Sequence, residues 1–150
     1  MEISVFSDFQ NASSCFSALE KSKGFSVKYN SLSDLKKKGP STPDDAVIYA
    51  DFGGMEQAAV KKNLSVLSSL NRVYGILDPK GSFDDPAVFF HAGASDYIGK
   101  ALFRSGIDAA RIKRVYEFGR KTLPIQTDKP DNAVKFTSPV SGNDWKKITQ

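Results

Sequence analysis

The feature that most constrains the fold is a regular alternation of short apolar runs with helix-like stretches through residues 1–121. A helical pattern repeats apolar residues every three to four positions, whereas a strand buried on both faces is a short continuous apolar run. By this criterion, strands are predicted at 3–7, 25–29, 45–51, 72–78 and 96–99. Helices are predicted at 11–24, 31–38, 55–70, 82–93 and 103–121. Five strand–helix units joined by short connections favour an α/β fold with a parallel sheet between helices.

The carboxyl ends of the predicted strands are where a functional site is expected. Strands with little polar alternation are covered on both faces, and right-handed crossovers then favour a doubly wound sheet. Such sheets bind ligands at the carboxyl ends of their strands, beside the switch point of the topology. Asp8, Asp51, Asp78 and Lys100 follow or end the first, third, fourth and fifth strands.

Three carboxylates and a lysine at one sheet edge would need compensation, because like charges brought together raise the free energy of the fold. Mg²⁺, which prefers oxygen ligands, is the expected cation. An aspartate beside Mg²⁺ and a lysine can attack a phosphoryl group and form an aspartyl phosphate. The alternative for each acid taken singly is a helix cap or a solvated loop residue.

The segment HAGASDYIGK, residues 91–100, closely resembles the stretch through the fifth strand of response-regulator receiver domains. The resemblance covers residues 1–121 by element order and implies a flavodoxin-like (CheY-like) sheet of five strands in the order 2-1-3-4-5. It implies that Lys100 is the family's lysine and Tyr97 its switch aromatic. It also implies that Asp51 is the phosphoacceptor, and that Asp8, Asp51 and the carbonyl of Gly53 bind Mg²⁺.

Several positions depart from the receiver pattern. Ser7 stands where many receivers have a second metal-binding acid, FGGM replaces the usual residues after the phosphoacceptor, and Ala101 replaces a proline after the lysine. The family's switch serine or threonine lies about 22 residues before its lysine, which corresponds to Asp78, or to Leu77 if the alignment shifts by one residue. A carboxylate at that position would repel a phosphate on Asp51.

The resemblance therefore implies a regulatory module of two-component signal transduction, not an enzyme. A carboxylate at position 78 favours a pseudo-receiver in which it strengthens metal binding or pairs permanently with Lys100. The alternative is a true receiver phosphorylated on Asp51 with Mg²⁺ by a sensor histidine kinase. Further alternatives are a dimerisation scaffold and a flavodoxin-like small-ligand binder. The binder is disfavoured because SDFQNASS, after the first strand, lacks a glycine-rich phosphate loop.

The last predicted helix carries two rows of apolar residues. Ile107, Ala110, Val115 and Phe118 form the row expected to face the core, while Ile112 and Tyr116 form a second row. The second row either extends the arc that covers the sheet or forms an interface. In the second case a homodimer through the last strand and helix is expected, as is common in receivers.

Residues 122–150 change in composition, with three prolines and little periodicity, and are predicted to be a linker or extension. A helix cap at Asn143 or Asp144, followed by Trp145, suggests that the chain continues into an output domain. The Asp-Trp-Lys triplet there faintly resembles the lead-in to bacterial class III adenylate/guanylate cyclase domains.

Charge and apolar content narrow the expected partners. The formal net charge is +4, but the lysines are scattered or lie in short runs at predicted helix ends, so nucleic acid is not an expected partner. The sequence contains neither a membrane-spanning run nor a signal peptide, which predicts a cytoplasmic location. Its only cysteine, Cys15, is expected to be buried in a helix.

Overall fold

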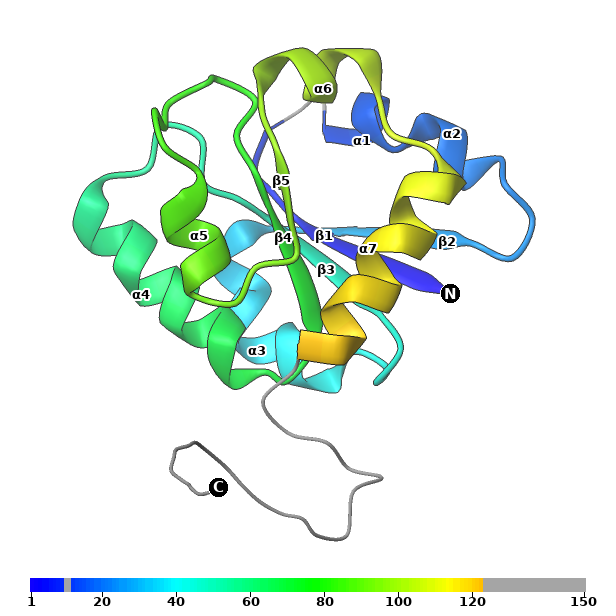
Figure 1. Cartoon of the computed structure of the whole chain (residues 1–150), viewed down its shortest axis with the longest axis horizontal. Coiled ribbons are helices and arrows are strands. Elements are labelled where there is room, and N and C mark those ends of the chain that lie inside the picture. Colours follow the sequence, from blue (N-terminus) through cyan, green and yellow to red (C-terminus); the bar gives the residue numbers. More distant parts are fainter. Residues whose placement is uncertain (10–11, 123–150) are drawn as a thin grey trace, which may run out of the picture.

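A computed structural model describes residues 1–9 and 12–122. Its five strands form one parallel sheet in the order β2-β1-β3-β4-β5, which is the predicted flavodoxin-like topology (Figure 1). The strands are β1 (Glu2–Phe6), β2 (Ser26–Asn30), β3 (Val47–Asp51), β4 (Val73–Leu77) and β5 (Asp96–Ile98). Every residue of β3 and β4 is buried, as expected for central strands covered on both faces.

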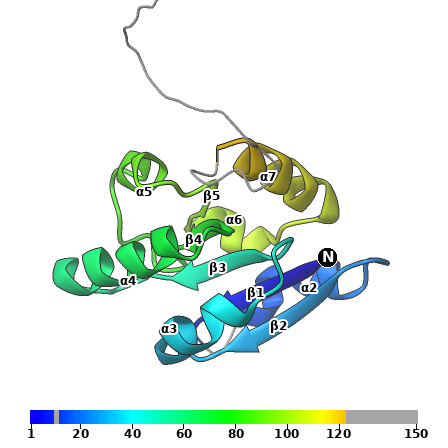
Figure 2. The same ribbon diagram turned by 90° about the horizontal axis from the view of Figure 1, so that it is seen from below.

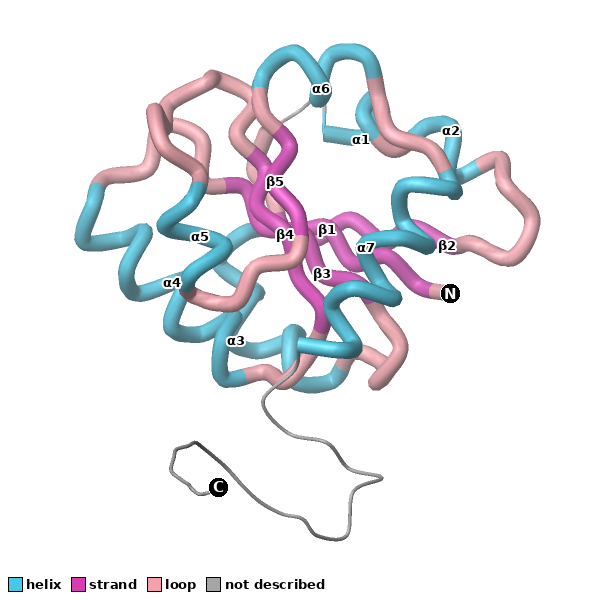
Figure 3. Tube along the Cα trace, in the orientation of Figure 1, coloured by secondary structure: helices cyan, strands magenta, loops and turns pink. Residues whose placement is uncertain are grey.

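Helices cover both faces of the sheet (Figure 2). One face packs against α1 (Ala12–Cys15), α2 (Ser17–Glu20), α6 (Lys100–Ser105) and α7 (Ala109–Thr122). The other face packs against α3 (Leu35–Lys38), α4 (Gln57–Ser69) and α5 (Ala87–His91). Two short 3-10 helices, η1 (Leu32–Asp34) and η2 (Gly39–Ser41), flank α3. Loops gather at the carboxyl ends of the strands, where the candidate site lies (Figure 3).

Two predicted helices are each divided into two. Within 11–24, Phe16 separates α1 from α2, and its fully buried ring packs into the core. Within 103–121, Gly106 ends α6 with a φ of +88°, a conformation that glycine adopts at little cost. Because α6 begins at Lys100, this lysine opens a helix and does not extend β5.

The predicted core row of the last helix was right for Ile107 and Val115, which are buried, and wrong for Ala110 and Phe118, which are exposed. Across the break at Gly106, helical spacing cannot be counted continuously, so the phase of α7 is set anew after residue 106. Ile112, Val115 and Gly119 face the sheet, and Ile112 is completely buried. Ile112 therefore belongs to the core and cannot form a dimer surface, whereas Phe118 is 54% exposed. Tyr116 is half-buried against the same core, with Arg120 above its ring.

The predicted linker and its Trp145 motif lie outside the described residues, apart from Thr122, which ends α7. Cys15 is buried in α1 as predicted. None of the helices within 1–9 and 12–122 is both long and apolar enough to cross a membrane.

Candidate functional site

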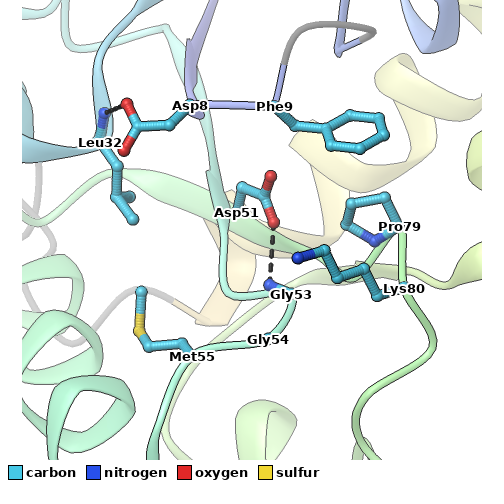
Figure 4. Close-up of a pocket in the computed structure, with 9 residues that line it drawn as sticks. All are labelled: Asp8, Phe9, Leu32, Asp51, Gly53, Gly54, Met55, Pro79 and Lys80. Atoms are coloured by element: carbon cyan, nitrogen blue, oxygen red, sulfur yellow. Dashed lines mark hydrogen bonds between the residues drawn. The ribbon is translucent and has the colours of Figure 1, made fainter.

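A pocket of about 340 Å³ lies at the carboxyl ends of β1, β3 and β4 (Figure 4). Asp51 is the last residue of β3, and Gly53 and Gly54 follow it in the next loop. Asp8 and Phe9 come from the loop after β1, while Pro79 and Lys80 come from the loop after β4. Leu32 and Met55 add an apolar side. The parallel sheet thus brings three loops and the start of η1 to one pocket, as its topology predicts.

Asp51 is 9% exposed, and each of its carboxylate oxygens accepts a hydrogen bond. The Ser7 hydroxyl donates to Oδ2 at 2.7 Å, and the Gly53 amide donates to Oδ1 at 2.8 Å. Burial raises the pKa of Asp51, an effect that these two hydrogen bonds oppose. The Asp78 carboxylate raises this pKa further, and the Lys80 ammonium lowers it.

Asp8 is turned away from Asp51. Its Oδ1 accepts hydrogen bonds from the Ser31 hydroxyl and from the Leu32 amide, each at 3.1 Å. These donors lie at the start of η1, so the Asp8 carboxylate caps this short helix. A helix cap was one of the alternatives to a metal ligand for each acid taken singly. Figure 4 shows its carboxylate directed toward Leu32.

Asp78 has no exposed surface and accepts three hydrogen bonds. The amide of Ser82 donates to Oδ1 at 2.8 Å, and the amide of Phe83 donates to Oδ2 at 3.1 Å. The hydroxyl of Tyr97 donates to the same Oδ2 at 2.6 Å. A buried carboxylate is stable only with such donors, so Asp78 holds the β4–α5 loop and the Tyr97 side chain together.

One face of the Tyr97 ring is packed, and Gly99 lies close to the ring. The ring stacks on Phe89 at 6.0 Å between ring centroids, with 11° between their planes. A Cβ atom at Gly99 would lie 3.2 Å from the ring, so a larger residue there would press on Tyr97. Burial raises the pKa of the Tyr97 phenol, and its hydrogen bond to the Asp78 carboxylate raises it further. Tyr97 is therefore a neutral donor to Asp78 at physiological pH.

Lys100 and Asp78 do not form the predicted pair. Lys100 is exposed, and its aliphatic stem lies beside Gly81, with Cδ 3.8 Å from the position of an added Cβ. Within the described chain, no ion pair joins Lys100 to Asp51 or Asp78. The lysine that lines the pocket with Asp51 is Lys80, which sequence reasoning missed. Its signal was its position in LDPK, two residues after Asp78 at the end of β4.

The residues present do not fit a carboxylate-rich Mg²⁺ site. Ser7 replaces one acid, and its hydroxyl already binds Asp51. The Asp8 carboxylate is turned to the start of η1 and accepts its hydrogen bonds there. Across residues 1–9 and 12–122, no group of three or more His, Cys, Asp or Glu side chains is arranged to hold a metal ion.

Comparison of the sequence with protein-family models and with curated proteins gives no match.

Proposed function

We propose that this chain is a receiver-like regulatory domain that controls an attached output domain without a phosphorylation switch. The observation that carries the proposal is the 2.6 Å hydrogen bond from the Tyr97 hydroxyl to the buried Asp78 carboxylate. This bond joins Asp78, at the position of the receiver family's switch serine or threonine, to Tyr97, at the position of the family's switch aromatic. We propose no catalytic activity for the domain itself.

The resemblance gives position 78 a hydroxyl that would bind a phosphate on Asp51, and Tyr97 an orientation that depends on this event. In this chain Asp78 already has three donors, so it needs no phosphate to complete its hydrogen bonds. As a carboxylate it would also repel a phosphoryl group on Asp51. Asp78 and the stacked Phe89 ring then orient Tyr97 without a phosphate, which imitates one fixed signalling state.

The proposed partner is the output domain, for which a nucleotide cyclase is the candidate that the tail resemblance suggests. A sensor histidine kinase has no role in this proposal, and the cytoplasm is the proposed compartment. A homodimer through the last strand and helix stays part of the proposal. Its apolar contacts would come from exposed side chains such as Phe118, because Ile112 is buried.

The test is phosphorylation of the intact chain with Mg²⁺ and acetyl phosphate, followed by mass spectrometry and amide chemical shifts. We expect no phosphoryl adduct on Asp51 and no shift change at Tyr97. A phosphoryl adduct on Asp51 with shifts at Tyr97 would establish the true receiver instead.

The matched variant is Asp78→Thr, which restores a hydroxyl at the switch position. When it is combined with Ser7→Asp and Lys80→Met, so that Mg²⁺ can also bind, we expect this variant to accept a phosphoryl group and to show phosphate-dependent shifts at Tyr97. Asp51→Asn in the same background is the control and should abolish both. Tyr97→Phe tests the alternative that the domain is only a dimerisation scaffold. If this substitution leaves the output activity of the full-length protein unchanged, the Tyr97–Asp78 hydrogen bond has no regulatory role.

A further inference from the structure

We infer that Lys80 is the resident cation of the acid pocket and takes the place that the receiver resemblance assigns to Mg²⁺. The inference rests on the proposed function, because a domain that needs no phosphoryl transfer needs no metal for it. Its direct support is the position of the Lys80 side chain among the pocket residues.

The loop that carries Lys80 is fixed at several points. Asp78 binds the amides of Ser82 and Phe83 through its side chain, and its carbonyl accepts the Gly81 amide at 3.1 Å. The Ser82 hydroxyl accepts the Gly54 amide at 2.8 Å, which ties this loop to the loop after β3. These hydrogen bonds hold the backbone on both sides of Lys80, so its side chain starts from a defined position.

The Lys80 ammonium extends into the pocket. Its Nζ lies 3.2 Å from the position that a Cβ atom at Gly54 would occupy. Figure 4 shows the side chain directed from the β4–α5 loop toward Asp51 and Gly53. Among the described residues the Lys80 ammonium forms no ion pair with Asp51, but its charge lowers the pKa of the Asp51 carboxyl through space, which is the electrostatic role of a nearby cation.

Gly54 accounts for the unusual FGGM sequence after the phosphoacceptor position. Its φ of +76° is a conformation that favours glycine. It also leaves open the space next to the Lys80 ammonium, which a side chain would have to displace. The second glycine thus allows both the turn of the loop and the approach of Lys80.

Mg²⁺ and Lys80 would compete for the same space. Mg²⁺ requires a near-octahedral set of oxygen ligands, and an ammonium nearby would repel it. The Asp51 oxygens already accept hydrogen bonds from Ser7 and Gly53, and Asp8 binds the start of η1. Restoring a metal site should therefore require two changes, a new acid at position 7 and loss of the charge at position 80.

The test is a Mg²⁺ titration of the intact chain followed by amide chemical shifts. The wild type is compared with three variants: Ser7→Asp, Ser7→Asp/Lys80→Met and Ser7→Asp/Lys100→Met. Spectra without Mg²⁺ verify that each variant is folded. The wild type should show no saturable shift at residues 51–54. Removing the Lys80 charge should tighten Mg²⁺ binding roughly tenfold or more relative to Ser7→Asp alone. The Lys100 change should have less than about a twofold effect, since Lys100 does not line the pocket and salt screens charges at a distance.

Three outcomes would overturn the inference: saturable Mg²⁺ binding at residues 51–54 of the wild type, equal effects of the Lys80 and Lys100 changes, or no Mg²⁺ binding when Ser7→Asp is combined with Lys80→Met. The variant Ser7→Asp/Lys80→Arg keeps the positive charge at position 80. Its affinity for Mg²⁺ should therefore stay as weak as that of Ser7→Asp. Mg²⁺ binding by the wild type without a phosphoryl adduct would refute this inference and leave the proposed function standing. An adduct formed by the wild type would refute the proposed function.

Discussion

Asp51 lies at the candidate site, and burial of its carboxylate lowers the stability of the folded chain. It is nearly enclosed, and burial raises its pKa despite the donors from Ser7 and Gly53. A carboxyl with a higher pKa in the folded state binds its proton more tightly there. Its ionisation therefore reduces stability as the pH rises from its unfolded pKa to its folded pKa, and the reduction is complete above the folded value.

We expect Asp51→Asn to increase the free energy of unfolding, and to do so more at pH 7.5 than at pH 4. Asparagine has no charge to desolvate; its Oδ1 can accept the Gly53 amide while its Nδ2 donates to the Ser7 hydroxyl oxygen. Urea unfolding at the two pH values measures the difference, with Asp8→Asn as the control at an exposed acid. An Asp51→Asn variant that is less stable at neutral pH would contradict this account.

Residue types at the sheet edge were predictable from the sequence, but their partners were not. Asp51 ends β3, and Asp8 and Asp78 follow β1 and β4, as predicted. Asp8 caps η1 because Ser31 and Leu32 come within hydrogen-bond distance of it, a contact between segments separated by more than 20 residues. Lys80 reaches the pocket and Lys100 does not, because the first lies on a loop that turns inward and the second opens α6.

At the scale of elements, a buried polar cluster joins α7 to the sheet. Asp96 of β5 is 4% exposed and accepts hydrogen bonds from Arg111 Nε at 3.1 Å and Arg111 Nη2 at 2.6 Å. Tyr49 of β3 donates its hydroxyl to the same carboxylate at 2.7 Å. The Asp96 carboxylate raises the pKa of the Arg111 guanidinium, so this side chain stays charged. The cluster connects a helix and two strands next to Tyr97.

Arg111→Ala should lower the free energy of unfolding by about 2 to 3 kcal/mol, because it leaves Asp96 buried without its cation. This loss in the free energy of unfolding is at or below the range for breaking a fully buried ion pair, because 29% of the Arg111 side chain is exposed. Arg114→Ala, an exposed neighbour on the same helix, should change stability by less than about 0.5 kcal/mol. Urea unfolding of both variants checks the prediction, which equal effects would refute.

The helices show where periodicity succeeds and where it fails. Residues 55–70 carry a regular apolar pattern and form α4 at Gln57–Ser69, close to its predicted bounds. Residues 103–121 also read as one helix, yet Gly106 and the hydrogen bond from the Ile107 amide to the Cys15 carbonyl divide them. That bond is a tertiary contact with α1, so no local pattern could have indicated it.

At the scale of the molecule, exposed apolar side chains remain on the helices beside β5. Phe118 on α7 and Val88 and Phe90 on α5 are each exposed by more than a third, and both helices flank the edge strand in Figures 1 and 2. The proposed homodimer would bury such side chains, which is the usual driving force for association. Ile112 cannot contribute, because it fills the space between α7 and the sheet.

We expect Phe118→Ser to shift the intact chain from dimer to monomer in sedimentation experiments, with its unfolding transition retained. Ile112→Ser should instead cost about 3 kcal/mol or more of stability, because it removes core packing and buries a hydroxyl. Lys113→Ser, at an exposed position of α7, is the control for a change that should affect neither property. A wild type that is monomeric at all concentrations would remove the dimer from the proposal.

Sequence patterns were enough to predict the parallel five-stranded sheet, its helical layers and the three aspartates at the carboxyl ends of the strands. These follow from local periodicity and from the handedness of strand connections, which act through burial of whole elements. The tertiary structure alone decided that Asp78 binds Tyr97, that Asp8 turns to η1 and that Lys80 faces Asp51. Hydrogen bonds require positions within a few tenths of an ångström, and loops set those positions only when the whole fold is assembled.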